Sequence, residues 1–227
     1  MKTLDRSQLP AGRILAGLLS YGLIAAALSC AAGPPIERGE FRQAALVEIT
    51  RLDPTARLDI RYASSNNFLG RPVYPEARAF LQRPAAEALV RAGQKLRGQG
   101  YGLLIFDGYR PWSVTKIFWD STPADKKQFV ANPKKGSMHN RGCAVDLTLY
   151  DLNTGAEVAM PSGFDEMSER AAADYAGGDP ASRRARDLLR SAMEGEGFTV
   201  YPFEWWHFDY KDWQSYRILN IPFSAIR

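Results

Sequence analysis

The spacing of apolar residues predicts amphipathic helices in three parts of the chain. Between Pro84 and Arg97, apolar side chains recur every three or four residues, which places them on one face of a helix. A proline suits the first turn of such a helix, and the glycines that follow suit its end. The stretch after Asp179 repeats this pattern, with a proline at its start and two glycines at its end. A further helix is expected after Pro111.

Short apolar and alternating runs predict strands between these helices. In Ala144–Tyr150 the residues alternate, so Asp146 should lie on one face of the strand and Val145 on the other, with Cys143 turned to the core. Because helices and strands are mixed without a strict βαβ order, we expect a single compact α+β domain over residues 46–227, a small mixed sheet with flanking helices. The expected strands are Leu46–Ile49, Leu58–Tyr62, Leu103–Phe106, Ala144–Tyr150, Phe198–Tyr201 and Trp206–Tyr210.

Residues 1–32 have the pattern of a secretory signal. A basic start with Lys2, Arg6 and Arg13 precedes the apolar run Ile14–Leu28, and small residues follow. The run is short for a membrane-spanning helix. The alternative is a buried N-terminal helix of the fold, but no polar face interrupts the run. We therefore expect an exported protein of the periplasm or cell envelope.

Two forms of processing remain open at the end of this signal. Residues 27–30, Ala-Leu-Ser-Cys, resemble a bacterial lipobox, in which Cys30 would be lipidated and would attach the protein to the membrane. Cleavage after Ala31 or Ala32 by an ordinary signal peptidase is the alternative. In both cases residues 33–45 are expected to be a polar linker that leads to the domain at 46–227.

Charge and cysteine content narrow the possible partners. Of the formal net charge of +4, residues 1–30 carry +2, and the remaining charges of both signs are interspersed. No basic stripe of the kind that binds a phosphate backbone is present, so we expect no nucleic-acid partner. The chain has two cysteines, and one of them, Cys30, lies in the processing zone. An internal disulfide is therefore not expected.

The chain contains two histidines, and both lie in polar clusters. His139 precedes the alternating strand, and His207 follows Glu204 by three residues. Two histidines and one carboxylate, with a position left for water, form a common catalytic zinc site. Asp146 is the natural third ligand, because a carboxylate between apolar strand residues is costly unless it is paired or bound to a cation. Two small residues, Gly142 and Ala144, leave space on its face.

Two further residues suit hydrolytic chemistry. The spacing of Glu204 before His207 can bring its carboxylate beside the attacking water without making it a ligand, as a general base requires. Arg110 follows a strand end and a glycine turn, where a rigid guanidinium suits an oxyanion or a substrate carboxylate. Asp107 is placed to hold it. The alternatives are a surface glutamate and a purely structural Asp–Arg pair.

The order of these residues resembles the zinc DD-peptidases. The pattern S-x-H-x-x-G-x-A-x-D, which begins at Ser137, followed by E-x-x-H, is similar to that clan. Residues 62–70, 100–111 and 146–150, together with the Glu-Trp-Trp-His of residues 204–207, look specifically like the VanX-type D-alanyl-D-alanine dipeptidases. The resemblance covers about residues 45–212.

This resemblance implies a zinc metallopeptidase that hydrolyses the dipeptide D-alanyl-D-alanine in cell-wall peptide turnover. It assigns one zinc ion per chain to His139, Asp146 and His207. It makes Glu204 the general base and Arg110 the residue that stabilises the transition state. Because the family's resistance enzymes are cytoplasmic, an export signal here indicates turnover of the dipeptide outside the cytoplasm.

The resemblance also implies how the substrate is bound. Asp165 matches the family's carboxylate for the substrate ammonium, and Ser137 and Tyr62 match residues that line the pocket. We group Asp107 with these substrate-binding residues. Three residues depart from those usual in the family and bear on pocket shape more than on chemistry: Met138, Asn140 and Cys143.

Two other functions use the same residues. A DD- or LD-carboxypeptidase would act on longer peptidoglycan peptides with the same zinc ligands. A non-catalytic zinc module would bind wall peptides, but such a module needs neither Glu204 nor Arg110.

Overall fold

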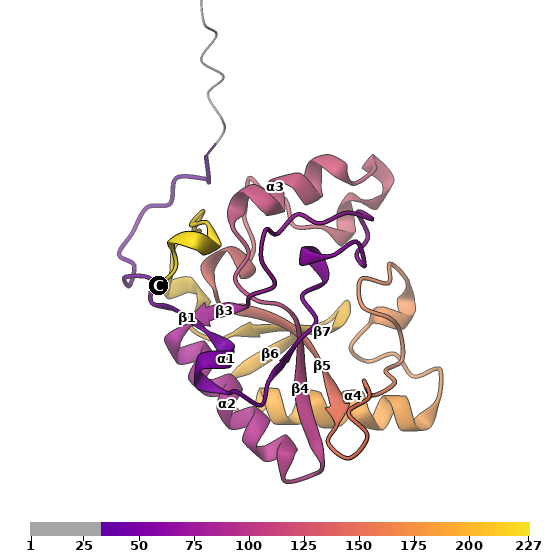
Figure 1. The fold of residues 1–227 in the computed structure, drawn as a ribbon. Helices are drawn as coiled ribbons and strands as arrows, with labels where there is room; N and C mark the ends of the chain where they lie inside the picture. Colours follow the sequence, from indigo (N-terminus) through magenta and orange to yellow (C-terminus); the bar gives the residue numbers. More distant parts are fainter. Residues whose placement is uncertain (1–32) are drawn as a thin grey trace, which may run out of the picture. The chain divides into compact units, whose positions relative to one another are not determined.

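A mixed five-stranded sheet forms the centre of the part of the chain that the computed structural model describes, residues 33–227 (Figure 1). The strand Arg57–Leu58 runs parallel to the strand Tyr101–Asp107, and the other neighbouring strands are antiparallel. The α+β class expected from the sequence is confirmed. In spatial order the strands are β2 (Arg57–Leu58), β4 (Tyr101–Asp107), β5 (Ala144–Asp151), β7 (Glu204–Tyr210) and β6 (Phe198–Tyr201). The predicted signal peptide and Cys30 lie outside the described residues.

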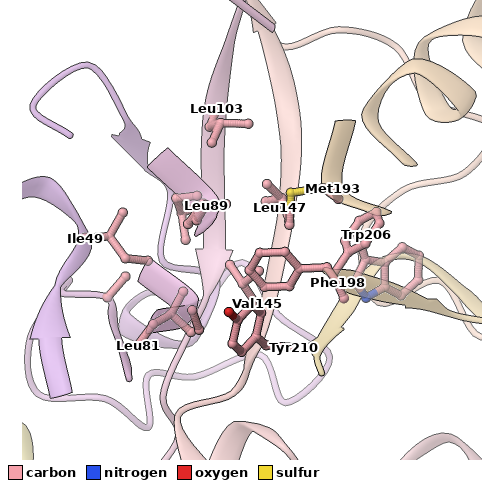
Figure 2. Close-up of a cluster of buried hydrophobic side chains, with 14 of the residues drawn as sticks. Ile49, Leu81, Leu89, Leu103, Val145, Leu147, Met193, Phe198, Trp206 and Tyr210 are labelled. Carbon is pink, nitrogen blue, oxygen red and sulfur yellow. The ribbon is translucent and has the colours of Figure 1, made fainter. Parts of the chain in front are cut away.

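The helices include two that cover one face of this sheet. The α-helices of the described residues are α1 (Ile49–Leu52), α2 (Arg83–Arg97), α3 (Trp112–Ser121) and α4 (Pro180–Glu194), and the two that cover this face are α2 and α4. Helices α2 and α4 pack against each other, and they also contact β4 and β6 respectively (Figure 1). Figure 2 shows Leu89 of α2 and Met193 of α4 beside Val145 and Leu147 of β5. These side chains are almost fully buried, so the alternation of β5 places its apolar residues under the helices and Asp146 on the other face.

A second sheet has two strands, of which the sequence predicted the first and not the second. Here β1 (Leu46–Glu48) pairs antiparallel with β3 (Phe80–Gln82), whose three residues are all buried. A short run without alternation carries no period by which a strand could be recognised. The Gln82 side chain accepts the N–H of Ala45 and donates to the carbonyl of Arg141, each at 2.8 Å. It thereby joins this sheet to the segment that carries His139.

The strand expected at Leu58–Tyr62 is wrong beyond Leu58. Residues Arg61–Ala63 form a 3₁₀ turn instead, and the carbonyl of Tyr62 accepts the N–H groups of Val73 and Tyr74 at 2.9 Å each. The chain therefore leaves the sheet here. The aromatic ring of Tyr62 is buried against Phe118 of α3 rather than standing on a strand.

Cys143, the residue immediately before β5, is buried, as expected. Burial raises the pKa of its thiol to about 12. The thiol is therefore neutral at physiological pH and behaves as a small apolar side chain.

The segment before β1 lies against the C-terminal part of the domain. The carboxylate of Glu37 pairs with Arg141 at 2.5 Å and accepts the N–H of Ile218 at 2.7 Å. Further along, Arg42 pairs with Asp212 at 2.9 Å. Within residues 33–227, no helix combines the length and apolar character needed to cross a bilayer.

Candidate active site

The pairing of β5 with β7 brings two of the expected ligands together. Asp146 lies directly opposite His207 in the antiparallel register. His139 comes from the 3₁₀ turn His139–Arg141 just before β5, and the chain enters the strand through Gly142 at φ 69°. A side chain at Gly142 would be strained by this φ and would also meet Leu46 at 2.5 Å. Glycine therefore allows the tight turn that directs His139 toward the strand.

The three side chains form a triangle whose size suits a zinc ion. His139 Nε2 and His207 Nδ1 are 3.0 Å apart, and they lie 3.3 Å and 3.0 Å from Asp146 Oδ1. Tetrahedral ligands at zinc distances of 2.0–2.1 Å are separated by about 3.3 Å. Among the described residues, these three form the group of His, Cys, Asp and Glu side chains whose atoms are arranged to hold a metal.

Each imidazole is also fixed at its other nitrogen. Nδ1–H of His139 donates to the carbonyl of Gly108 at 2.7 Å, and Nε2–H of His207 donates to Asp209 at 2.9 Å. These bonds set the tautomers that direct His139 Nε2 and His207 Nδ1 to the triangle, as outer partners do in metal sites. Sequence reasoning missed Asp209, although strand alternation places it on the same face as His207.

The electric field at the triangle favours a positive charge. Burial alone would raise the pKa of Asp146, but the charges and hydrogen bonds of the two histidines hold it well below its ordinary value. Burial alone would lower the pKa of His207, yet the carboxylates of Asp209 and Asp146 raise it well above its ordinary value. A cation at this point would compensate the same carboxylates.

Arg110 is buried beside the triangle, and Asp107 holds its guanidinium in place. Its Nε donates to Oδ2 of Asp107 at 2.9 Å, and its Nη2 forms an ion pair with the same oxygen at 2.8 Å and lies 3.8 Å from Asp146 Oδ2. The other oxygen of Asp107 accepts the hydroxyl of Tyr74 and the N–H of Gly108, each at 2.8 Å. Asp107 is 1% exposed and is not among the residues that line the pocket. It lies where it can hold Arg110 and not where it would contact a substrate.

Glu204 is the first residue of β7, three positions before His207. Its Oε2 lies 3.9 Å from His207 Nδ1, near the triangle without belonging to it. Burial raises the pKa of Glu204 above its ordinary value. A carboxylate of raised pKa beside a cation site accepts a proton more readily than an ordinary glutamate, as a general base requires.

These groups open into one pocket of about 250 Å³. Tyr62, Ser137 and Asp165 line it, as expected from the sequence, together with the ligands, Arg110 and Glu204. The hydroxyl of Tyr62 donates to both oxygens of Asp165 at 3.1 Å and 3.0 Å. The apolar walls, which the sequence did not indicate, include Phe68, Phe118, Phe129, Val130, Phe203 and Trp206.

Asp165 has a backbone conformation that is uncommon for a residue with a side chain. Its φ is 59°, the left-handed region, where aspartate is tolerated better than most residues. Among the described non-glycine residues it is the one with positive φ. Such conformations concentrate at functional sites, where the surrounding structure holds them.

Comparisons with known proteins agree with this geometry. The family model of Peptidase_M15, described as D-ala-D-ala dipeptidase, matches residues 42–224. A D-alanyl-D-alanine dipeptidase of Escherichia coli (strain K12) is 37% identical over 180 residues, which cover 79% of this chain and 92% of that protein. A D-alanyl-D-alanine dipeptidase of Enterococcus faecium is 40% identical over 176 residues, covering 69% and 86% respectively.

Among solved structures, the chain is similar to the vancomycin-resistance D,D-dipeptidase VanXYg in complex with a D-Ala-D-Ala phosphinate analogue. The identity is 18%, the TM-score is 0.40, and the alignment covers 74% of this chain and 67% of that one. A likeness of this degree carries no argument about activity. The family match and the two curated relatives do, and from them we conclude that this chain belongs to the D-Ala-D-Ala dipeptidase family of metallopeptidases, Peptidase_M15.

Proposed function

We propose that this protein hydrolyses the dipeptide D-alanyl-D-alanine with zinc as its cofactor. The observation that carries the proposal is the convergence of a zinc-sized ligand triangle, a carboxylate and a buried guanidinium on one small pocket, in a member of this family. His139, Asp146 and His207 would hold the metal. When bound there, zinc supplies Lewis acidity, which lowers the pKa of water and polarises a carbonyl group.

Glu204 is the general base of the proposed reaction. Its carboxylate accepts a proton from the attacking water and then donates that proton to the nitrogen of the leaving D-alanine. Burial raises the pKa of Glu204, so its carboxylate takes up a proton more readily than an ordinary glutamate does, which supports its role as a base.

Arg110 stabilises the negative charge that develops on the carbonyl oxygen. Its hydrogen bond and its ion pair with Asp107 fix the guanidinium before substrate arrives, so little reorganisation is needed when the charge forms. The ring of Phe118 lies over it at 4.7 Å and excludes water from one side.

Asp165 binds the free ammonium of the dipeptide in this proposal. Burial and the neighbouring carboxylates of Asp146 and Glu204 raise the pKa of Asp165 to about 8. A carboxyl group with this environment is stabilised in its charged form by a cationic partner, and a substrate ammonium is such a partner. The hydroxyl of Tyr62 orients the carboxyl group of Asp165. The hydroxyl of Ser137 lines the same pocket.

The size of the pocket supports a dipeptide rather than a longer peptide. Its volume of about 250 Å³ lies below the ~300–1,000 Å³ of pockets that hold drug-sized ligands. A DD- or LD-carboxypeptidase would present an amide nitrogen, and not an ammonium, to Asp165. The pocket therefore favours the dipeptidase reading over the carboxypeptidase alternative.

We also propose that residues 1–32 direct export, so that the enzyme acts in the periplasm or cell envelope. A basic start, an apolar run and small residues support this. Membrane attachment through a lipidated Cys30 is the form of processing that the lipobox-like residues support. The substrate would then be dipeptide released from peptidoglycan outside the cytoplasm.

The first prediction concerns substrate length. The purified enzyme should contain one zinc per chain and should cleave D-Ala-D-Ala, while a pentapeptide ending in D-Ala-D-Ala should react at least about 10–100-fold more slowly in kcat/KM. Loss of a charged hydrogen bond at Asp165, worth about 1.5–3 kcal/mol, sets this range. Metal analysis measures the zinc content, and the rate of D-alanine release measures kcat/KM for each substrate. Equal kcat/KM for the two substrates would favour the carboxypeptidase instead.

The second prediction separates the base from the ligands. Glu204→Gln should bind zinc as the wild type does and lose about 10²–10⁴-fold in kcat, because an amide of the same size cannot take the proton. Zinc content and kcat on D-Ala-D-Ala are measured together. Glu87→Gln, at an exposed glutamate of α2, is the matched control and should change neither value. A Glu204→Gln enzyme that retained more than a few per cent of kcat would rule out this base.

The third prediction uses the raised pKa of Asp165. In the unfolded chain an aspartate has a pKa of about 4, so the folded state binds the proton more tightly and the stability of the metal-free protein falls as pH rises from about 4 to about 8. Asparagine at position 165 does not titrate, so the variant does not lose stability in this way. The Tm advantage of Asp165→Asn should therefore be small at pH 5 and should grow by at least about 2–4 °C by pH 8, which corresponds to about 1 kcal/mol.

Thermal unfolding of chelator-treated protein across this pH range is the measurement. The relief of backbone strain by asparagine adds an offset that does not depend on pH. Asp174→Asn, at an exposed aspartate, is the control and should follow the wild type at every pH. A constant difference between Asp165→Asn and the wild type would show that Asp165 does not titrate in this range.

The fourth prediction concerns the mature N-terminus. Mass spectrometry of protein from the native host should find either an acylated Cys30 or a plain terminus after Ala31 or Ala32. Cys30→Ser distinguishes the two, because it should block lipoprotein maturation and leave ordinary signal cleavage intact. Recovery of intact Met1 in the cytoplasm would contradict export.

A further inference from the structure

The hydrogen bond between His207 and Asp209 differs in kind from its counterpart at His139. His139 donates its outer N–H to a backbone carbonyl, that of Gly108, which remains whatever side chain the residue carries. His207 donates its outer N–H to a carboxylate, Oδ1 of Asp209, at 2.9 Å. The orientation of the His139 imidazole is thus set by the backbone, whereas that of the His207 imidazole depends on the side chain of Asp209.

The strand register explains why Asp209 can reach the ring. It lies two residues after His207 on β7 and therefore on the same face of the sheet. Its neighbours across the sheet are Ala144 on β5 and Thr199 on β6. Because Ala144 is small, the Asp209 carboxylate can lean along the strand toward His207. Its side chain is 20% exposed and is not one of the ligand group.

We propose that Asp209 is a positioning residue of the metal site, an inference that rests on the proposed function. Its carboxylate holds His207 as the tautomer with hydrogen on Nε2, so that the lone pair of Nδ1 faces Asp146 and His139. It also makes the imidazole a more basic ligand. Asp209 is not one of the ligand group, so in this proposal its effect on the metal passes through His207.

A contact with substrate is the competing role, because Asp209 also lines the pocket. The two roles differ in their measurable effects. A positioning residue changes the affinity of the protein for zinc in the absence of substrate. A substrate contact changes KM and leaves that affinity as it was.

The test is competition between the protein and a chelator for zinc, without substrate, for the wild type, Asp209→Ala and Asp209→Asn. Asp209→Ala should bind zinc about 10–100-fold more weakly, the usual loss when an outer partner of a ligand is removed. Asp209→Asn should fall between the two, since its amide oxygen accepts the same hydrogen bond without the charge. Asp212→Ala, which removes only the exposed pair with Arg42, should bind zinc as the wild type does.

A spectroscopic measurement reports the hydrogen bond directly. The untagged chain has two histidines, so a nitrogen-15 spectrum of its imidazoles contains two rings. In the zinc-loaded wild type, Nε2–H of His207 should be protected from exchange with water, and in Asp209→Ala this protection should be lost. The Asn variant should retain it, which also shows that the chain is folded.

The outcomes separate this inference from the function on which it rests. A wild type that binds no zinc would refute the proposed function itself. A wild type that binds zinc, with Asp209→Ala equal to it within twofold and Nε2–H still protected, would overturn only the role of Asp209. A rise in KM with unchanged zinc affinity would likewise overturn it and assign Asp209 to the substrate.

Discussion

The pairing register of β5 and β7 is the constraint on which the candidate site depends. It places Asp146 directly opposite His207, and side chains of directly opposite residues lie within contact distance. A shift of one residue in either strand would turn one of these side chains to the face covered by α2 and α4. Val145 and Leu147, on either side of Asp146, are apolar and lie buried under those helices. Burial of the core therefore fixes the geometry of the ligands.

The turn after β4 couples two parts of the chemistry. Asp107 ends the strand and holds Arg110, and the next residue, Gly108, offers its carbonyl to His139. The carbonyl of Phe80 in β3 would lie 2.7 Å from any Cβ at Gly108, so this turn runs too close to β3 for a side chain. The guanidinium and one metal ligand are thus positioned by the same four residues, and a disturbance of the turn would affect both.

Periodic parts of the chain could be predicted from the sequence, because regular spacing carries the information. Helix α2, strand β5 and the face on which Asp146 lies were predicted in this way, whereas both histidines were identified from their polar surroundings. The strand expected to reach Tyr62 was wrong, since hydrogen bonds to residues 73 and 74 decide the turn there. The link from Tyr74 to Asp107 joins residues 33 positions apart, and no local pattern indicates it.

Asp209 is a different case, because the alternation of β7 placed it beside His207 and the rule that found Asp146 would have found it too. The roles of Asp165 and Ser137 came from family resemblance, not from spacing. The contact of Asp165 with Tyr62 spans 103 residues and becomes visible only in the folded chain.

The neutral, core-facing thiol of Cys143 has a consequence for metal selectivity. This residue lies three positions before Asp146, close enough in sequence that a different strand phase would bring sulfur to the ligand face. A thiolate donor would favour soft ions such as Cu(I). Because burial keeps this thiol protonated, with a pKa of about 12, the donors of the triangle are two imidazole nitrogens and one carboxylate oxygen. Strand phase and desolvation together thus discriminate against thiophilic ions at this site.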